Sequence, residues 1–118
     1  MQNSLCAAVD GDGFLACDLM VENTASMESH QAVALRVGSD LSQFYRCSFL
    51  GNQDTLYVHS LRQFYKDCRI EGTIDFIFGN AATVFHGCKI LVRPGRISSS
   101  IITAQGRTDP AQTSGIVF

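Results

Sequence analysis

Three short stretches of the sequence decide its fold: YRCSF at residues 45–49, KDCRI at residues 66–70 and HGCKI at residues 86–90. Each has a cysteine in the middle, and the spacing is 21 residues from Cys47 to Cys68 and 20 residues from Cys68 to Cys88. A fixed repeat near twenty residues is typical of a solenoid, in which each coil covers the apolar face of its neighbour. We therefore expect one solenoid coil per cysteine.

A fourth stretch, ACDL at residues 16–19, resembles these three and has its cysteine thirty residues before Cys47. We expect it to belong to a further coil with a loop of about ten extra residues, since insertions in repeat proteins fall in loops. This interpretation gives Cys17 the same position in its coil as the three later cysteines.

The residues between the cysteines indicate that the coils consist of β-strands. Short runs rich in Phe, Tyr, Ile, Val and Thr occur at residues 55–58, 75–78 and 83–85, and Gly, Asn and Asp separate them. No window keeps an apolar i, i+3, i+4, i+7 pattern over three helical turns. The leucine and asparagine ladder of leucine-rich repeats is also absent. The sequence therefore predicts an all-β fold, a right-handed single-stranded parallel β-helix.

Composition and charge exclude several classes of protein. The 118 residues include 9 Lys+Arg and 11 Asp+Glu, and 46% of them are hydrophobic, which suits one globular unit of ordinary polarity. No apolar run approaches the ~20 residues of a membrane span, and no basic block marks a nucleic-acid partner. No two cysteines have CxxC spacing, and His30, His59 and His86 are not clustered near them, so we do not expect a zinc site. We also expect no cofactor.

Both ends of the sequence indicate a piece of a longer protein. The first ten residues contain no basic and apolar regions of a secretion signal, and residues 113–118 (TSGIVF) end in an apolar run that is typical of a strand. We expect residues 1–118 to form part of one β-helix domain that is truncated at both ends.

Cysteines in the same position of successive coils form a column, because equivalent strands lie about 4.8 Å apart. A Cα distance of about 5 Å is within the range for a disulfide, so Cys47–Cys68 and Cys68–Cys88 pairings both satisfy the geometry. Three reduced cysteines that fill the core are an equally good interpretation. The total of five cysteines leaves at least one without an internal partner.

Two aspartates form a second predicted column, since Asp54 and Asp75 each follow a repeat cysteine by seven residues. Two carboxylates about 5 Å apart repel each other by about 3 kcal/mol at an effective dielectric constant of about 20. Such pairs occur mainly where carboxyls with separated pKa values carry out acid/base or nucleophilic chemistry, or where they hold a cation. The alternative is that the aspartates cap turns. Gln53, and Gln31 about one coil earlier, offer neutral amides that donate hydrogen bonds to an oxyanion.

These residues lie in three segments of the sequence: QAVAL at residues 31–35, QDTLY at residues 53–57 and DFIFGN at residues 75–80. Their order and spacing resemble three signature segments of plant pectin methylesterases. Three flanking stretches are also similar to that family: GDGF at residues 11–14, RVGSD at residues 36–40 and TAQGRTDP at residues 103–110. The resemblance covers essentially the whole chain.

The resemblance implies a right-handed parallel β-helix that hydrolyses the methyl esters of homogalacturonan without a metal. By position, Asp75 resembles the nucleophile that forms an acyl-enzyme. Asp54 resembles the general acid that protonates the departing methanol and then the base that activates water. Gln53 and Gln31 resemble the groups that stabilise the tetrahedral oxyanion.

The resemblance also implies a site for a polysaccharide. Tyr57, Phe76 and Phe78 are candidates to contact the faces of the sugars, and packing of the phenylalanines in the core is the alternative. The expected partners are methyl-esterified pectin and a proteinaceous pectin methylesterase inhibitor, and the expected location is the cell wall after secretion.

Two family segments, Gly-x-Tyr-x-Glu and Leu-Gly-Arg-Pro-Trp, do not occur in the sequence, and RPGR at residues 93–96 does not replace the second of them. The family arginine would pair with the nucleophilic carboxylate, so we expect activity of this chain alone to be impaired. Two alternatives follow: a non-catalytic β-helix that binds pectin or an inhibitor, and a β-helix hydrolase or lyase that shortens the polysaccharide.

Overall fold

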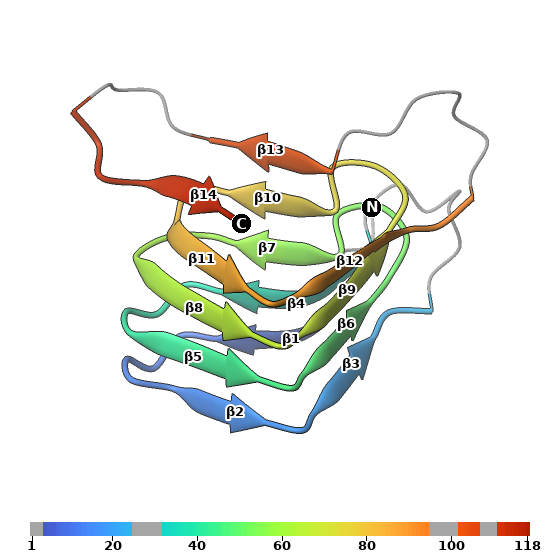
Figure 1. The fold of residues 1–118 in the computed structure, drawn as a ribbon, viewed down its shortest axis with the longest axis horizontal. Coiled ribbons are helices and arrows are strands. Elements are labelled where there is room, and N and C mark those ends of the chain that lie inside the picture. Colours follow the sequence, from blue (N-terminus) through green and yellow to red (C-terminus); the bar gives the residue numbers. More distant parts are fainter. Residues whose placement is uncertain (1–3, 25–31, 95–101, 107–110) are drawn as a thin grey trace.

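The computed structural model describes residues 4–24, 32–94, 102–106 and 111–118 (Figure 1). In these parts the chain forms strands β1 to β14, and no helix is long and apolar enough to cross a membrane. Successive strands belong to three different sheets in turn, so that three strands and their turns make one coil. The coils stack from the end that contains β1, β2 and β3 toward the end that contains β13 and β14 (Figure 1).

The three sheets are named A, B and C. Sheet A contains β1 (Ser4–Val9), β4 (Ala32–Val37), β7 (Leu56–Val58), β10 (Ile77–Gly79) and β13 (Thr103–Gln105). Sheet B contains β2 (Leu15–Cys17), β5 (Ser42–Tyr45), β8 (Arg62–Lys66), β11 (Ala82–His86) and β14 (Gly115–Val117). Sheet C contains β3 (Met20–Glu22), β6 (Ser48–Leu50), β9 (Arg69–Gly72) and β12 (Lys89–Val92).

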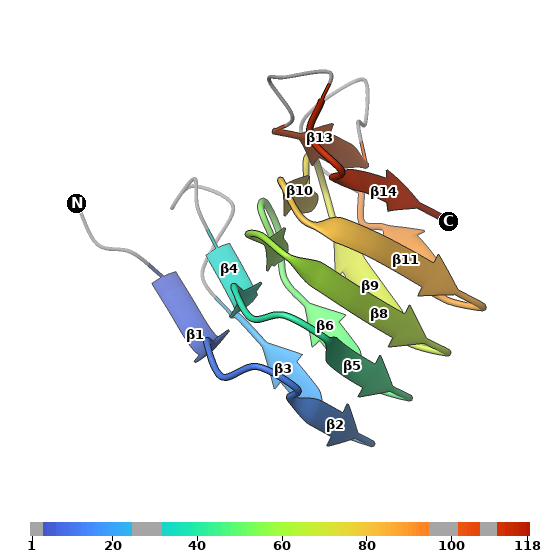
Figure 2. The same cartoon turned by 90° about the vertical axis from the view of Figure 1, so that its left-hand side faces the viewer.

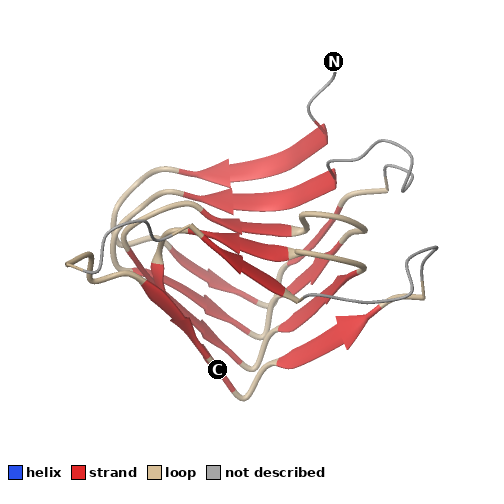
Figure 3. Cartoon of the chain, turned by 90° about the horizontal axis from the view of Figure 1, so that it is seen from above, coloured by secondary structure: helices blue, strands red, loops and turns tan. Residues whose placement is uncertain are grey.

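Every strand pairing among the described residues is parallel, and each strand pairs with the strand of the same sheet in the next coil. The sheets therefore form three walls around one core (Figures 2 and 3). Along β8 buried and exposed side chains alternate, because successive side chains point to opposite faces of a strand. The predicted parallel β-helix is confirmed.

The predicted position of Cys17 is wrong by two residues. Cys17 pairs with Tyr45, at the end of a strand of sheet B, and not with Cys47. The amide of Ser48 donates to the carbonyl of Leu19, just as the amide of Arg69 donates to the carbonyl of Cys47. Leu19 therefore occupies the position that the cysteines occupy in later coils.

The core contains a ladder of aromatic rings from the strands of sheet B. The ring of Tyr65 stacks on Phe44 and on Phe85, with centroid distances of 4.8 Å on both sides. Beside this ladder, the buried Cys47 and Cys68 and the partly buried Cys88 are free thiols. The Sγ of Cys68 donates to the carbonyl of Phe44 at 3.4 Å, in the preceding coil. The reduced-cysteine interpretation thus holds for this structure.

The corner from sheet B to sheet C has the same length in each described coil. The strands are separated there by residues 18–19, 46–47, 67–68 and 87–88. The first residue of each corner has a left-handed backbone, with φ of 57° for Asp18, 52° for Arg46, 53° for Asp67 and 63° for Gly87. One turn geometry is therefore repeated at this edge of the solenoid.

Candidate active site

The predicted aspartates lie in the turns that lead from sheet C to sheet A. Asp54 comes two residues before Leu56 in β7, and Asp75 comes two residues before Ile77 in β10. Leu56 and Ile77 are register partners, so the two aspartates have equivalent positions in neighbouring coils. We call residues 51–55 and 73–76 the acid turns. They place two carboxyls one coil apart, where strands are about 4.8 Å apart.

Both aspartates have a left-handed backbone, with φ of 59° at Asp54 and 46° at Asp75. Residues other than glycine rarely adopt this conformation, although aspartate tolerates it better than most residues do. Left-handed residues of this kind are often found at functional sites, where the surrounding structure holds them in place.

The acid turns are held by main-chain hydrogen bonds between neighbouring coils. The amide of Thr73 donates to the carbonyl of Asn52 at 2.9 Å, and the amide of Gly51 donates to the carbonyl of Glu71 at 3.3 Å. The buried hydroxyl of Thr55 donates to the same carbonyl of Glu71 at 2.8 Å. These bonds connect the turn that contains Asp54 to the strand and turn that lead to Asp75.

A close approach of the chain fixes the second acid turn. Phe76, directly after Asp75, packs over Gly72, where an added Cβ would lie 2.2 Å from the Cβ of Phe76. The same Cβ would lie 2.8 Å from the main-chain oxygen of Asn52. A glycine is therefore needed at residue 72 because any side chain would displace the turn.

The carboxyl of Asp54 has a raised pKa. Asp54 is half-buried, and its burial, together with the charge of Asp75, raises its pKa to about 6. The carboxyl of Asp54 therefore keeps its proton in mildly acidic solution, where an ordinary aspartate is ionised. A protonated carboxyl next to a second carboxyl is the arrangement that general acid catalysis with a carboxylate nucleophile requires.

Next to the acid turns, the outer face of sheet A has two stacked aromatic rings. Tyr57 and Phe78 are register partners and are partly exposed, with ring centroids 4.5 Å apart. The ring of His59 packs edge-on against Tyr57 at 5.1 Å. The stacked pair leaves apolar ring surface partly exposed on this face of the sheet.

Arg36 extends this surface and was missed by the sequence analysis. It is the register partner of Tyr57 in the preceding coil, and its guanidinium lies 5.9 Å from the ring centroid. Its Nη1 also donates to Oδ1 of Asp10 at 3.2 Å. The similar patterns of LRV at residues 35–37 and LYV at residues 56–58 were the signal in the sequence.

The other predicted site residues have different positions. Gln53 directly precedes Asp54 in the same acid turn and is partly exposed. Phe76 is fully buried in the core, so its predicted contact with a sugar is wrong and the alternative of core packing holds. Gln31 lies outside the described residues. Among the residues that the structure describes, no three His, Cys, Asp or Glu side chains are grouped to hold a metal ion.

The described part of the chain is thus a parallel β-helix with a pair of carboxyls beside two partly exposed aromatic rings. The chain belongs to the pectinesterase family, whose family model matches residues 2–118. Pectinesterase 2 of Citrus sinensis is 60% identical over 115 residues, which are 98% of this chain. A solved pectin methylesterase from carrot is 59% identical, covers 98% of this chain and has a TM-score of 0.92.

A further solved structure contains a pectin methylesterase mutant in complex with a hexasaccharide. It is 32% identical, covers 86% of this chain and has a TM-score of 0.72. The chain spans only part of these relatives: 22% of the Citrus protein, 37% of the carrot structure and 34% of the mutant in the complex.

Proposed function

We propose that this chain carries the acid pair of a pectin methylesterase, which hydrolyses the methyl esters of homogalacturonan to pectate and methanol. The observation that carries this proposal is the position of Asp54 and Asp75 in equivalent turns of neighbouring coils, together with the raised pKa of Asp54. Membership of the pectinesterase family supports the choice of substrate.

The proposed reaction has two steps. In the first, an oxygen of the ionised Asp75 attacks the ester carbonyl carbon, and Asp54 gives its proton to the departing methoxide, which leaves as methanol. In the second, Asp54 takes a proton from water, and the hydroxide attacks the acyl carbon. The bond to Asp75 breaks, which regenerates its carboxylate and releases the galacturonate. Amides of Gln53, and of Gln31 by resemblance, donate to the oxyanion in both steps.

The outer face of sheet A is the proposed binding surface for the polymer. Tyr57 and Phe78 would contact sugar rings, and Arg36 would attract the free carboxylates of partly de-esterified galacturonan. A hexasaccharide bound to a related pectin methylesterase supports an extended site for a chain of sugars. The plant cell wall, where pectin is found, is the proposed location, and a proteinaceous inhibitor is a proposed second partner.

The first testable prediction concerns the nucleophile. Purified protein is incubated with highly esterified pectin, and released methanol is measured for the wild type, Asp75→Ala and Asp54→Asn. We expect both substitutions to reduce the rate, by a factor of about 10² to 10⁴, because each removes one of the two groups that the chemistry needs. Size chromatography of the treated pectin should show no loss of chain length. Equal methanol release by the wild type and Asp75→Ala would overturn the enzymatic proposal, and shortened polymer would favour depolymerisation.

A second candidate function is non-catalytic binding of pectin by the same surface. The exposed aromatic pair and the arginine beside it favour this candidate independently of the acids. Binding of oligogalacturonides that persists in Asp75→Ala, in a wild-type chain that releases no methanol, would identify a binding module. Methanol release above the Asp75→Ala background would identify the esterase.

A further inference from the structure

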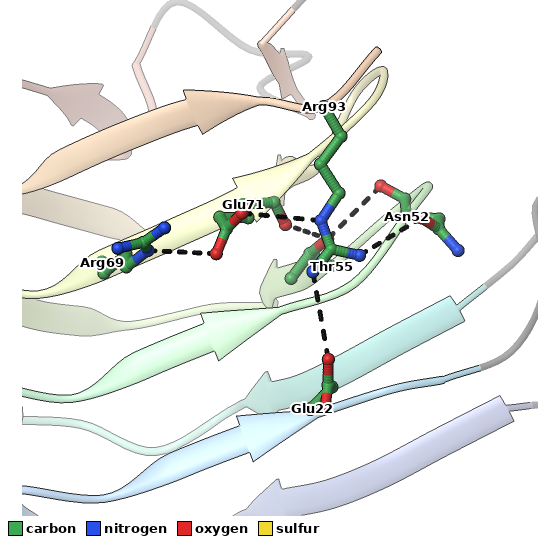
Figure 4. A network of polar contacts seen from close by, with 6 residues as sticks. All are labelled: Glu22, Asn52, Thr55, Arg69, Glu71 and Arg93. Carbon is green, nitrogen blue, oxygen red and sulfur yellow. Dashed lines mark hydrogen bonds and ion pairs between the residues drawn. The ribbon is translucent and has the colours of Figure 1, made fainter. Parts of the chain in front are cut away.

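A group of charged side chains lies on the outer face of sheet C, beside the first acid turn (Figure 4). Glu71 in β9 is at its centre, and only 17% of its side chain is exposed. Its Oε2 accepts from Nε of Arg69 at 3.0 Å, and its Oε1 lies 3.6 Å from Nε of Arg93. Arg93 follows β12 in the next coil and also approaches Glu22, two coils below Glu71, at 4.0 Å.

Arg93 connects this group to the turn that contains Asp54. Its Nη1 donates to Oδ1 of Asn52 at 3.3 Å, and its main-chain amide donates to the carbonyl of Gly72 at 2.7 Å. Asn52 is two residues before Asp54, and its own carbonyl accepts from the amide of Thr73 in the second acid turn. One guanidinium thus reaches across two coils to the residue that joins both acid turns.

The shape of the arginine head group suits this arrangement. A guanidinium has five N–H donors in a rigid plane, so one edge can face a carboxylate while another donates to an amide oxygen. Glu71 is held from the other side by Arg69, which fixes the carboxylate against which Arg93 rests. The position of the Arg93 guanidinium is therefore set by partners on three different strands or turns. The hydrogen bond from Arg93 in turn holds the side chain of Asn52 in place.

We propose that Arg93 is a positioning residue that fixes the first acid turn through Asn52 and so holds the carboxyl of Asp54 in place, which rests on the role proposed above for Asp54. Arg93 itself does not contact the reacting groups. Its effect on the reaction comes from keeping Asp54 next to Asp75 in a half-buried position.

The direction in which the pKa of Asp54 changes when Arg93 is replaced separates a positioning role of Arg93 from a purely electrostatic one. Burial first, and the charge of Asp75 second, raise the pKa of Asp54, and both effects weaken if the turn moves outward. Displacement of the turn therefore lowers the pKa of Asp54 toward its usual value of 3.8. Loss of a nearby positive charge, without displacement, would change it in the opposite direction and raise it.

The experiment compares Arg93→Gln with Arg69→Gln, a matched control that also removes an ion pair with Glu71. The pKa of Asp54 is measured from the pH dependence of its carboxyl carbon signal by nuclear magnetic resonance, with Asp54→Asn to assign the signal. We expect Arg93→Gln to lower this pKa, and Arg69→Gln, which leaves the hydrogen bond from Arg93 to Asn52 in place, to lower it less. In a chain that releases methanol, we expect Arg93→Gln to lower kcat by about tenfold to a hundredfold, because small displacements of reacting groups have effects of this size, with little change in KM.

Two further variants test the route through Asn52. Asn52→Ala should lower the pKa of Asp54 as Arg93→Gln does, and the double variant should add nothing, because the two residues act as one unit. If Arg93→Gln does not fold, Arg93→Lys keeps a cation beside Glu71 but loses the planar fork, and we expect it also to lower the pKa. An unchanged or raised pKa in the folded Arg93 variant, or an equal decrease in Arg69→Gln, would overturn the proposal. The titration needs no turnover, so it remains decisive if the chain releases no methanol.

Discussion

Two sets of turns in this β-helix have the same left-handed backbone conformation but different surroundings. The corners from sheet B to sheet C and the acid turns from sheet C to sheet A both place a left-handed residue in successive coils, and Gly87 is the one glycine among those of the described corners and acid turns. In the corners these residues are exposed, and opposite charges face each other, with Arg46 bound to Asp18 at 2.9 Å. In the acid turns, Asp54 and Asp75 have like charges, and Asp54 is half-buried with a raised pKa.

The difference shows which feature points to chemistry. In this fold the chain changes direction sharply at a left-handed residue in many turns, so the backbone conformation alone does not identify a functional site. A column of opposite charges in water costs little, whereas a column of like charges that is partly removed from water is destabilising. The acid turns thus combine a common backbone with an unfavourable charge arrangement, and the second property distinguishes them.

The largest expected effect is on the packing that holds the second acid turn. In Gly72→Ala, the new methyl group would overlap the buried side chain of Phe76 and the main chain at Asn52. We expect the free energy of unfolding to fall by about 3 kcal/mol, at the upper end of the usual cost of overpacking. Urea denaturation measures this change. A loss below about 1 kcal/mol would mean that the turn is soft, contrary to the rigid acid turn described above.

The second effect tests the cost of the like charges. The folded state raises the pKa of Asp54 from 3.8 to about 6, so the folded protein loses stability as pH rises through this interval, where the unfolded chain ionises more readily. We expect Asp54→Asn to increase the free energy of unfolding at pH 7 by about 1 to 2 kcal/mol. This is less than the roughly 3 kcal/mol that the difference in pKa implies, because the carboxyl is partly exposed to solvent.

The control for this prediction is the same substitution in a corner. Asp18→Asn removes an exposed charge that is paired with Arg46, and we expect no measurable change in a urea titration. At pH 3.5 the stabilisation by Asp54→Asn should disappear, because Asp54 is then largely protonated in both states. A gain of equal size at pH 3.5 would show that the effect does not come from charge.

The smallest effect should come from the left-handed backbone of a corner. Gly87 has φ of 63°, and a Cβ there would lie 2.6 Å from Oδ1 of Asp67, at the end of a side chain that can move away. We expect Gly87→Ala to lower the free energy of unfolding by about 1 kcal/mol, the cost of placing a side chain on a left-handed residue. A loss as large as that of Gly72→Ala would remove the distinction between the two sets of turns.

The repeat of the fold was predictable from sequence because the coil length stays almost constant between Cys47 and Cys88. The same spacing gave the equivalence of Asp54 and Asp75, since both cysteines and aspartates keep the register that Leu56 and Ile77 set. The earlier coil was placed two residues out of register. Cys17 is at the end of a strand and pairs with Tyr45, and the hydrogen bond from the amide of Ser48 to the carbonyl of Leu19 shows that Leu19 belongs to the column.

The remaining features of the site depend on contacts between distant residues. Arg93 and Asn52 are 41 residues apart, and no short pattern relates them. A strand alternation places Phe76 and Phe78 on the same face, so the sequence could not separate them. Phe76 lies before β10, directly after the left-handed Asp75, and is buried, whereas Phe78 in the strand is partly exposed. The pKa of Asp54 depends on how far the turn is removed from water, which is set by packing in three dimensions.

The aromatic ladder in the core has a consequence for spectroscopy. The chain has three tyrosines and no tryptophan, and Tyr65 is fixed between Phe44 and Phe85, with its hydroxyl donating to Gln63 in the interior. A tyrosine held in such asymmetric surroundings produces a near-ultraviolet circular dichroism signal that is lost when the packing loosens. The protein therefore contains a natural optical marker, without any label, for whether its coils remain in contact.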